Sequence, residues 1–522
     1  MQSGQGSRRT TRRGFNRSAA VAAGLAASFP LHRASAIPTA PTQAAMLLQD
    51  SGDLPEVYLW QNQIALTRPE GSNPEKLEAV RQVISDGSGT APIAYVPPPG
   101  DAGEERLNLT LGSRGEELDI FAGDWDEYKE AVQPINDLLD EHGTAVREAY
   151  SEQQWAGVTD VEGNIWGIPR LGLMGHTHAI FLRTDWLEEL QIEMPATLEE
   201  LEAAIEAFRE LEPESSILAS NLGDLRMSTV GGFTEFGYSR WLDPEDDRVK
   251  PPELQPGFRD WVARMNEWYE KGWFLPETFS SPGTDRDVEY FRTGRVGTFI
   301  GWYSRITIHA ERVLSAVPGM WYDPAWGITG PEGLMKTNNA DLNAAVMITK
   351  KSRDPAAAMR FINWQYEAKE NAVTAFYGVQ GVDWEWEDDY YVNLLTIDDP
   401  DIYAGEFFSA AGLVTETWFA PADPDRRRHR EWIRDYTFAY DTGKMPVDAE
   451  VPYDRSLIRD KVPGLADLDR LIEEETTKFI TGTRPLEEWD AFLEQLESAG
   501  LQDWIDAYTE QFLQYQEANQ GS

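Results

Sequence analysis

The sequence predicts an α/β fold with at least two domains, on three observations. The chain has 522 residues, which is long for a single domain. Residues 57–121 alternate apolar runs of strand length with helical patterns. Residues 163–213 repeat the same order of strand, loop and helix. Strands that alternate with helices are typical of sheets covered by helices, and 41% hydrophobic residues can fill more than one core.

Residues 1–36 are predicted to be a twin-arginine export signal. They contain six arginines and no acidic residue, and residues 11–15 (TRRGF) resemble the twin-arginine motif. A short apolar stretch at 18–31 and the small residues 34–36 fit a signal peptide and its cleavage site. We therefore expect a periplasmic or extracellular protein that is exported by the twin-arginine route. A disordered basic tail is the alternative for this segment.

The chain is strongly acidic and contains no cysteine. Its formal net charge is −43, which repels nucleic acid, so we expect no nucleic-acid partner. Without cysteine there is no disulfide and no lipid-anchor cysteine, and we expect the protein to be free rather than tethered. The excess of acids is either an adaptation to high salt or a general property of an acidic exported protein.

The first region predicts a parallel sheet. Three strands are expected at Val57–Thr67, Ile93–Val96 and Leu118–Phe121, with helices at Pro74–Ser85 and Glu104–Leu111 between them. This order favours right-handed crossovers. Ligands of open α/β sheets gather beyond the carboxyl ends of the strands, which is where Asp124 and Trp125 follow the third strand.

Residues 163–213 predict a second strand-and-helix unit. Ala179–Leu182 is apolar and suits a buried strand, and Thr184 can cap a short helix that ends at Leu190. Thr197 and Glu200 have the spacing of a capping box at the start of an amphipathic helix, which Pro213 ends.

The remainder continues the pattern as far as the C-terminus. The glycine-rich residues 221–237 are expected to form a loop. Strands are expected within 291–300 and 344–348, and helices at 257–272, after Asp354-Pro355, and at 468–480 and 493–515.

Several segments together resemble a known family. They are GNIWGIP with the following RTDWL and PATLEE, then DIFAGDWDEY, WYEKGWFLPE, ITKKSRDPAAAMRFINW and TGTRPLEEWDAF. Together they resemble the extracellular solute-binding proteins of ABC importers. Within that family they are most similar to the large oligosaccharide-binding type, the LplA-like and alginate-binding groups.

The resemblance implies a two-lobe periplasmic-binding-protein-like α/β fold with hinge crossovers and a helical C-terminal extension. It places an N-terminal lobe at 55–165 plus 304–366, and a C-terminal lobe with the closing helices at 166–303 plus 367–522. It implies an oligosaccharide ligand in a cleft between the lobes and the permease subunits of an ABC transporter as partners. We expect a monomer.

A sugar site needs aromatic faces for the C–H side of the ring and polar groups for the hydroxyls, which are costly to bury unpaired. From strand ends and from the resemblance, the candidate residues for stacking are Trp125, Trp166, Trp302, Tyr303 and Trp384. The candidates for polar contacts are Asp124, Arg170, His178 and Asn343.

Two other classes of protein stay open. A secreted glycoside hydrolase needs two carboxylates at a fixed separation, and no spacing among 89 acids singles out such a pair. A structural or adhesive surface protein is disfavoured by the dense α/β pattern. There is no G-x-S-x-G elbow, P-loop or H-E-x-x-H motif, so we expect no enzyme, no cofactor and no metal.

Three local clusters have a structural as well as a functional interpretation. Asp243–Asp247 lacks the glycine and the twelfth-position glutamate of a calcium loop, so a solvated turn is favoured. His176 and His178 lie on one face of a strand without a third metal ligand in the spacing. Arg426–Arg430 is favoured as a salt-bridged helix, with a contact to an anionic ligand as the alternative.

Overall fold

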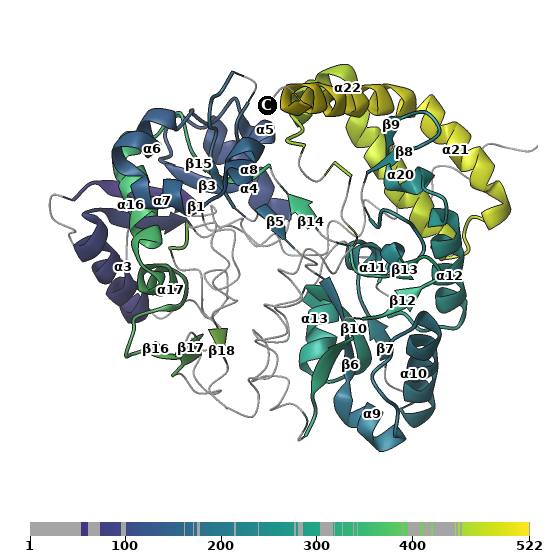
Figure 1. The fold of residues 1–522 in the computed structure, drawn as a ribbon. Coiled ribbons are helices and arrows are strands. Elements are labelled where there is room, and N and C mark those ends of the chain that lie inside the picture. Colours follow the sequence, from purple (N-terminus) through teal and green to yellow (C-terminus); the bar gives the residue numbers. More distant parts are fainter. Residues whose placement is uncertain are drawn as a thin grey trace, which may run out of the picture. The chain divides into compact units, whose positions relative to one another are not determined.

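The computed structural model (Figure 1) describes two α/β units and a set of C-terminal helices. The described residues are 54–60, 74–95, 101–160, 162–170, 172–174, 178–212, 216–238, 240–275, 278–279, 285–302, 317, 319–325, 327–337, 339–341, 343–388, 390–394, 408–410, 419–420, 444, 447–448 and 451–520. The predicted export signal, Tyr303, His176 and the Arg426–Arg430 cluster lie outside these residues.

The first sheet confirms the predicted parallel order. Strands β1 (Glu56–Trp60), β2 (Ala91–Tyr95) and β3 (Ile120–Asp124) pair in parallel, with β1 in the middle. The sheet continues through β15 (Ala344–Ile348), antiparallel to β3, and β4 (Ile168–Pro169). All five residues of β2 are buried, as expected for a sheet covered on both faces.

Helices connect and cover this sheet. The crossover helices are α3 (Pro74–Ser88) and α4 (Asp101–Gly112). Helix α16 (Pro355–Glu367) packs on α3 and β1, and Asp354 caps it by accepting a hydrogen bond from the backbone N–H of Ala357 at 2.9 Å, as predicted. The remaining helices of this unit are α5 (Trp125–Tyr128), α6 (Asn136–His142), α7 (Thr144–Glu148), α8 (Glu152–Gly157) and α17 (Lys369–Tyr377).

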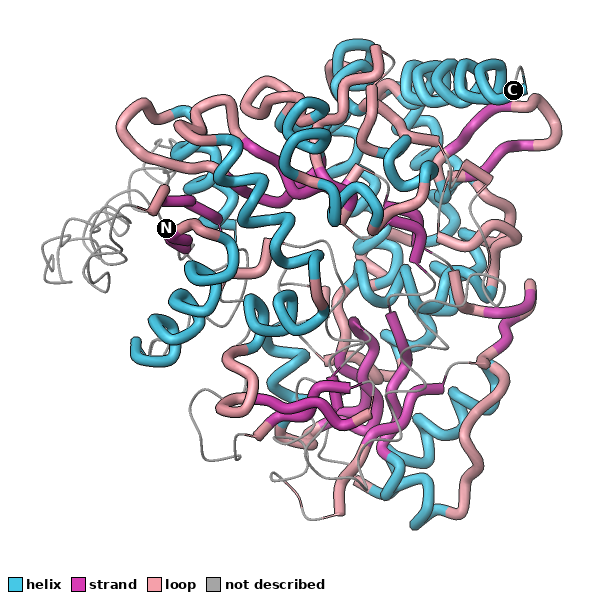
Figure 2. Tube along the Cα trace, turned by 60° about the vertical axis from the view of Figure 1, so that its left-hand side comes forward, coloured by secondary structure: helices cyan, strands magenta, loops and turns pink. Residues whose placement is uncertain are grey.

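The second sheet has the order β11-β6-β10-β7. Strand β6 (His178–Arg183) pairs antiparallel with both β11 (Tyr322–Ala325) and β10 (Val296–Trp302), and β7 (Ser216–Ala219) is parallel to β10. The fully buried positions of β6 explain why its sequence shows an apolar run rather than an alternation. Figure 2 shows the strands of the molecule with helices packed along them.

Helices around the second sheet bury one apolar face each. Helix α10 (Leu198–Leu211) buries Leu201, Ile205 and Phe208, and α12 (Phe258–Glu270) buries five apolar residues at helical spacing. Helices α9 (Thr184–Leu190) and α13 (Asp285–Arg292) flank the strands.

Two local predictions in this unit are corrected. Thr184 does not cap α9, because its hydroxyl donates to Asp323 at 3.1 Å. Arg183 occupies the N-cap position, and its side chain does not cap the helix. Residues 221–237 are not simply a loop: Asn221 caps helix α11 (Leu222–Thr229), whose Leu222 and Leu225 are buried. The predicted cap of α10 is confirmed at Thr197, which accepts from the N–H of Glu200, whereas the Glu200 carboxylate accepts from Ala196 instead of completing the box.

Two antiparallel strand pairs connect the sheets along the chain. β5 (Gly172–Met174) follows β4 and pairs with β14 (Asn339–Asp341), which precedes β15. The four strands therefore form a ribbon in which two of the chain's crossings between the sheets run side by side. Gly167 stands at its start, where a Cβ would come within 2.9 Å of the carbonyl oxygen of Val346.

The predicted lobe boundaries stay a proposal. The strand pairings and helix contacts show which sheet β11 joins and which unit α17 packs against. β11 belongs to the second sheet by its pairing with β6, and α17 packs on α3 and α16 of the first unit. β16 (Trp384–Glu387), β17 (Tyr390–Asn393) and β18 (Phe419–Ala420) form a small separate sheet.

The predicted helical C-terminal extension is confirmed. It consists of α19 (Arg455–Lys461), α20 (Leu465–Ile480), α21 (Trp489–Ser498) and α22 (Leu501–Gln520). Their apolar faces join the core of the second unit, where Ile458, Phe479 and Phe492 are fully buried. Helix α22 also packs on β9 (Arg248–Lys250), which forms a hairpin with β8 (Trp241–Asp243). Among the described residues, no helix combines the length and apolar character needed to cross a membrane.

Candidate functional site

The carboxyl end of β3 brings together four of the predicted site residues: Asp124, Trp125, Asn343 and, beside Trp125, Trp166. The strand ends at Asp124, and Trp125 begins α5 directly after it. The backbone N–H of Trp125 donates to the carbonyl oxygen of Asn343 at 3.1 Å, and the Asn343 side chain donates to the carbonyl oxygen of Tyr453 at 2.6 Å. Because Asn343 lies between β14 and β15, this end of the sheet is fixed to both the chain crossing and the C-terminal segment.

Trp125 and Trp166 form a parallel aromatic pair. Their ring centroids are 6.3 Å apart with an interplanar angle of 6°, and both rings are buried. The indole N–H of Trp125 donates to the Gly157 carbonyl at 2.9 Å, and that of Trp166 donates to Asp160 at 2.8 Å. These edge contacts fix the orientation of both rings.

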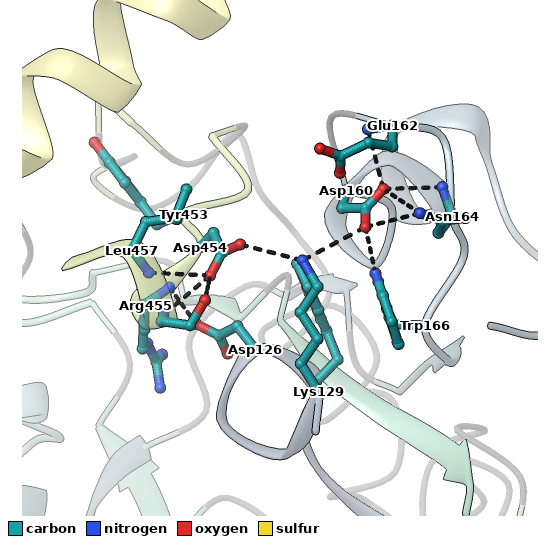
Figure 3. A network of polar contacts seen from close by, with 12 residues as sticks. Asp126, Lys129, Asp160, Glu162, Asn164, Trp166, Tyr453, Asp454, Arg455 and Leu457 are labelled. Carbon is teal, nitrogen blue, oxygen red and sulfur yellow. Dashed lines mark hydrogen bonds and ion pairs between the residues drawn. The ribbon is translucent and has the colours of Figure 1, made fainter. Parts of the chain in front are cut away.

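Lys129 lies over this pair. Its Nζ is 5.3 Å from the centroid of Trp125 and 5.1 Å from that of Trp166, within the range of cation–π attraction. The same Nζ lies 3.5 Å from Asp160 and 3.6 Å from Asp454, so Lys129 sits between two carboxylates, as Figure 3 shows. Lys129 thus occupies one side of the aromatic pair with a cation.

The carboxylates around Lys129 differ in protonation behaviour. Burial acts to raise the pKa of Asp160, but hydrogen bonds from Trp166 and Asn164 and the charge of Lys129 outweigh it and lower that pKa. Burial raises the pKa of Asp126 to about 6, although the charge of Arg455 opposes the shift. One oxygen of Asp126 accepts from the backbone N–H of Arg455, while Oδ1 is buried without a hydrogen-bond partner. In the polar network of Figure 3, Asp126 therefore has a buried oxygen whose desolvation no hydrogen bond offsets.

His178 and Trp302 form a second cluster in the second sheet. They are register partners at the ends of β6 and β10, and the imidazole meets the indole edge to face at 5.4 Å. The Nε2 atom of His178 lies 2.9 Å from the Asp224 carboxylate, whose other oxygen accepts from Asn221 at 2.8 Å. Asp224 takes this position because Asn221 caps α11 and α11 packs on β6 and β10.

Gly301 lies beside this second cluster. A Cβ at this position would lie 2.5 Å from the Phe299 ring, which is too close, and 3.4 Å from Asp224, which is an ordinary contact. The glycine therefore leaves room for the Phe299 ring. The site combines an aromatic face with a histidine whose orientation a carboxylate fixes, which is suited to hydroxyl-rich ligands.

The described contacts of Arg170 and Trp384 are with residues outside both clusters. Arg170 follows β4, and its backbone N–H donates to the Ala344 carbonyl at 2.9 Å. Trp384 is 0% exposed, packs with Val373 and Tyr377, and donates its indole N–H to the Gly378 carbonyl at 2.7 Å. These are the contacts of a packing residue, and a ligand contact of Trp384 stays a prediction, as it does for every candidate residue.

The acidic turn at 243–247 is held by a lysine. The ammonium group of Lys250 bonds to Asp243 and lies 2.8 Å from Asp246, and it helps to lower the pKa of Asp243 against the effect of burial. The described part of the chain contains no group of three or more histidine, cysteine, aspartate or glutamate side chains placed to hold a metal ion.

Several residues of these clusters were missed in the sequence: Lys129, Asp160, Asp224 and Arg455. Asp224 carried a usable signal, because Asn221 with an acid three residues later is typical of a helix start. Arg455 carried none, because it meets Asp124 across 331 residues of sequence.

Comparison with known proteins gives one family and a consistent set of relatives. The profile described as "Bacterial extracellular solute-binding protein" matches residues 91–372. The polygalacturonan/rhamnogalacturonan-binding protein YtcQ of Bacillus subtilis is 23% identical over 68% of this chain and 71% of its own length. The fructooligosaccharide ABC transporter substrate-binding protein FusA of Streptococcus pneumoniae is 20% identical over 74% of this chain and 77% of its own.

Solved structures agree with this fold. The alginate-binding protein AlgQ2 superposes with a TM-score of 0.66 at 18% identity, covering 88% of this chain and 99% of AlgQ2. FusA in complex with kestose gives a TM-score of 0.63 at 18% identity, covering 89% of this chain and all of FusA. At these identities the likeness concerns the fold, and it confirms the two-lobe architecture expected from the sequence.

Proposed function

The chain belongs to the family of bacterial extracellular solute-binding proteins, and on that premise we propose that it captures an oligosaccharide between its two lobes and delivers it to the permease of an ABC transporter. Closure of two lobes around a ligand works because the closed state makes contacts that the open state lacks, which shifts the population towards closure. The glycoside hydrolase alternative has no support among the relatives.

The observation that carries the proposal is the pairing of His178 with Trp302. A sugar ring offers an apolar C–H face and a rim of hydroxyls. Trp302 is only partly buried at the end of β10 and offers an indole face, while His178 and Asp224 offer hydrogen-bonding groups beside it. This combination at adjacent strand ends suits a sugar better than an apolar or a small ionic ligand.

The candidates at the first sheet are proposed to act at the side of the ligand opposite His178 and Trp302. Asp124 and Asn343 lie at the end of the first sheet and would accept from and donate to hydroxyls, with Arg170 beyond β4 as a further donor. Trp125, Trp166, Tyr303 and Trp384 are proposed as aromatic contacts. The burial of Trp125 and Trp384 in this conformation makes Trp302 the first residue to test.

The class of ligand is proposed from the named ligands of relatives. They are polygalacturonan and rhamnogalacturonan for YtcQ, fructooligosaccharides for FusA and alginate for AlgQ2. All are carbohydrates of several units, which supports an oligosaccharide for this chain. We further propose a monomer without catalytic activity, exported through the twin-arginine signal at 1–36 and free of a lipid anchor.

Calorimetry against a panel of oligosaccharides, paired with chromatography of the recovered sugar, tests the function. The panel includes kestose and nystose as neutral ligands and trigalacturonate and alginate trisaccharide as acidic ones. We expect saturable binding of at least one of them with the sugar recovered intact. Recovery of cleaved products would support a hydrolase, and no binding across the panel would contradict oligosaccharide capture.

A further inference from the structure

We infer that Arg455, at the start of α19, is a positioning residue for the proposed ligand site: it ties the C-terminal helices to the carboxyl end of β3 and holds Asp124 in place. This inference rests on the proposed function, because it concerns the same site. It assigns a role to a residue that is outside the candidate set and distant from it in sequence.

Arg455 contacts the last residue of β3 and the first turn of α5, and Arg459 of the same helix adds a third contact. The Arg455 guanidinium pairs with Oδ2 of Asp124, and its backbone N–H donates to the carboxylate of Asp126. One turn later, the guanidinium of Arg459 donates to the backbone carbonyl of Asp126 at 3.0 Å. Together these contacts fix both the last residue of β3 and the first turn of α5.

The preceding residue extends the connection to the aromatic pair. Asp454 lies 3.6 Å from Lys129, whose ammonium group covers Trp125 and Trp166. Figure 3 shows the Asp454 carboxylate directed at the ammonium group of Lys129, with Asp126 beside Arg455. The segment therefore contacts Asp124 and Asn343 directly and is connected to Trp125 and Trp166 through Lys129.

The segment itself is held rigidly by the second unit. Gln511 of α22 both donates to the carbonyl oxygen of Asp454 at 3.0 Å and accepts from its N–H at 2.8 Å. Tyr453 packs against Tyr508 with ring centroids 4.9 Å apart, and Ile458 is fully buried in the core. A rigid mount is what a positioning group requires, because its geometry is transmitted to its partner.

The ion pair is better suited to positioning than to stabilising the fold. The Arg455 side chain is 40% exposed, and ion pairs of that exposure contribute little to folding. A carboxylate can accept from several donors, so Asp124 can be oriented by Arg455 through one oxygen and still accept from a ligand hydroxyl. Losing Arg455 should therefore weaken ligand binding more than folding.

The experiment compares Arg455→Ala and Arg455→Lys with Lys461→Ala as the matched control. Lys461 is also on α19, but its ion pair joins it to Glu510 of α22 and, among the described residues, not to the end of β3. Hydrogen exchange of the peptide covering residues 124–131 is measured without ligand. Affinity is measured by calorimetry with nystose and with trigalacturonate.

We expect Arg455→Ala to speed exchange in residues 124–131 and to weaken the binding of whichever probe the wild type takes by roughly tenfold, the scale of one charge-assisted hydrogen bond. Arg455→Lys should recover part of the affinity, since it keeps the charge, and Lys461→Ala should change neither readout. Unchanged exchange, unchanged affinity, or equal effects of Lys461→Ala would each overturn the positioning role.

The two proposals fail differently. If the wild type binds a probe and Arg455→Ala binds it equally well, the positioning role is wrong and oligosaccharide capture stands. If the wild type binds no member of the oligosaccharide panel, capture fails, and the positioning role fails with it.

Discussion

His178 and Trp302 are register partners on antiparallel strands, and their rings meet edge to face at 5.4 Å. The imidazole is buried and its Nε2 contacts Asp224, whereas the indole is partly exposed. A buried polar group whose orientation a carboxylate fixes thus lies beside a partly exposed indole. It makes this pair the most direct place to test ligand binding.

Trp302→Ala should lower ligand affinity by roughly 1–3 kcal/mol, the scale of a stacking contact that is lost when an aromatic side chain is truncated. The free energy of unfolding should change little, since the ring is partly exposed. Calorimetry and thermal unfolding of the same sample separate the two effects. A large drop in melting temperature with unchanged affinity per folded molecule would place Trp302 in the core instead.

Trp384→Ala is the complementary variant. Trp384 is fully buried and its indole N–H is bonded to the Gly378 carbonyl. We expect a loss of about 3–5 kcal/mol in the free energy of unfolding, as for large aromatic truncations in cores. Urea unfolding measures it. Weaker ligand binding with unchanged stability would support the ligand contact proposed from the sequence and contradict the packing role.

Asp224→Ala removes the partner of a buried histidine. We expect a loss of roughly 1–3 kcal/mol in stability, because His178 loses a hydrogen bond in a buried position, and a loss of affinity as the imidazole reorients. Asp224→Asn keeps an acceptor of the same shape and should recover most of both. Equal affinity in all three proteins would exclude the His178–Asp224 pair from the site.

The sequence was sufficient for features that depend on local pattern. The parallel order of β1, β2 and β3 followed from alternating strands and helices, and the cap at Asp354 followed from residue type and position. Asn221 was misjudged because the glycines after it outweighed a helix-start signal.

Contacts between distant parts of the chain could not be predicted. Lys129 between Asp160 and Asp454, and Arg455 on Asp124, depend on how α19 packs against the end of β3. With 89 acidic residues, no pattern in the sequence selects which carboxylate meets which cation. These contacts nevertheless determine the electrostatics of the candidate site.

Asp126 predicts a specific dependence of stability on pH. Its pKa is raised to about 6 in the folded protein, mainly by burial, from an ordinary value near 3.8. The folded state therefore binds this proton more tightly than the unfolded state. Its contribution to the free energy of unfolding should rise as the pH falls from about 6 to about 4, by at most about 3 kcal/mol.

Asp126→Asn tests this contribution, because it removes the titration and keeps the shape of the side chain. Urea unfolding at several pH values between 4 and 7 gives the difference between variant and wild type. The variant should be the more stable protein near pH 7, and its advantage should shrink towards pH 4. A constant difference across this range would show that Asp126 does not titrate near pH 6.

Gly167 lies just before β4, where the chain closely approaches β15. A Cβ at this position would lie 2.7 Å from the Cβ of Ala345 and 2.9 Å from the Val346 carbonyl oxygen, and backbone atoms of a paired strand cannot easily move away. Gly167→Ala should therefore cost roughly 1–3 kcal/mol of stability through overpacking. Ligand affinity should also fall, because Trp166 is the preceding residue and a shift of the strand displaces its ring from Asp160.

Gly115→Ala is the control, since no atom lies within 4 Å of its added Cβ. If both variants unfold at the wild-type urea concentration and bind ligand equally well, the close approach at Gly167 does not constrain the crossing strands.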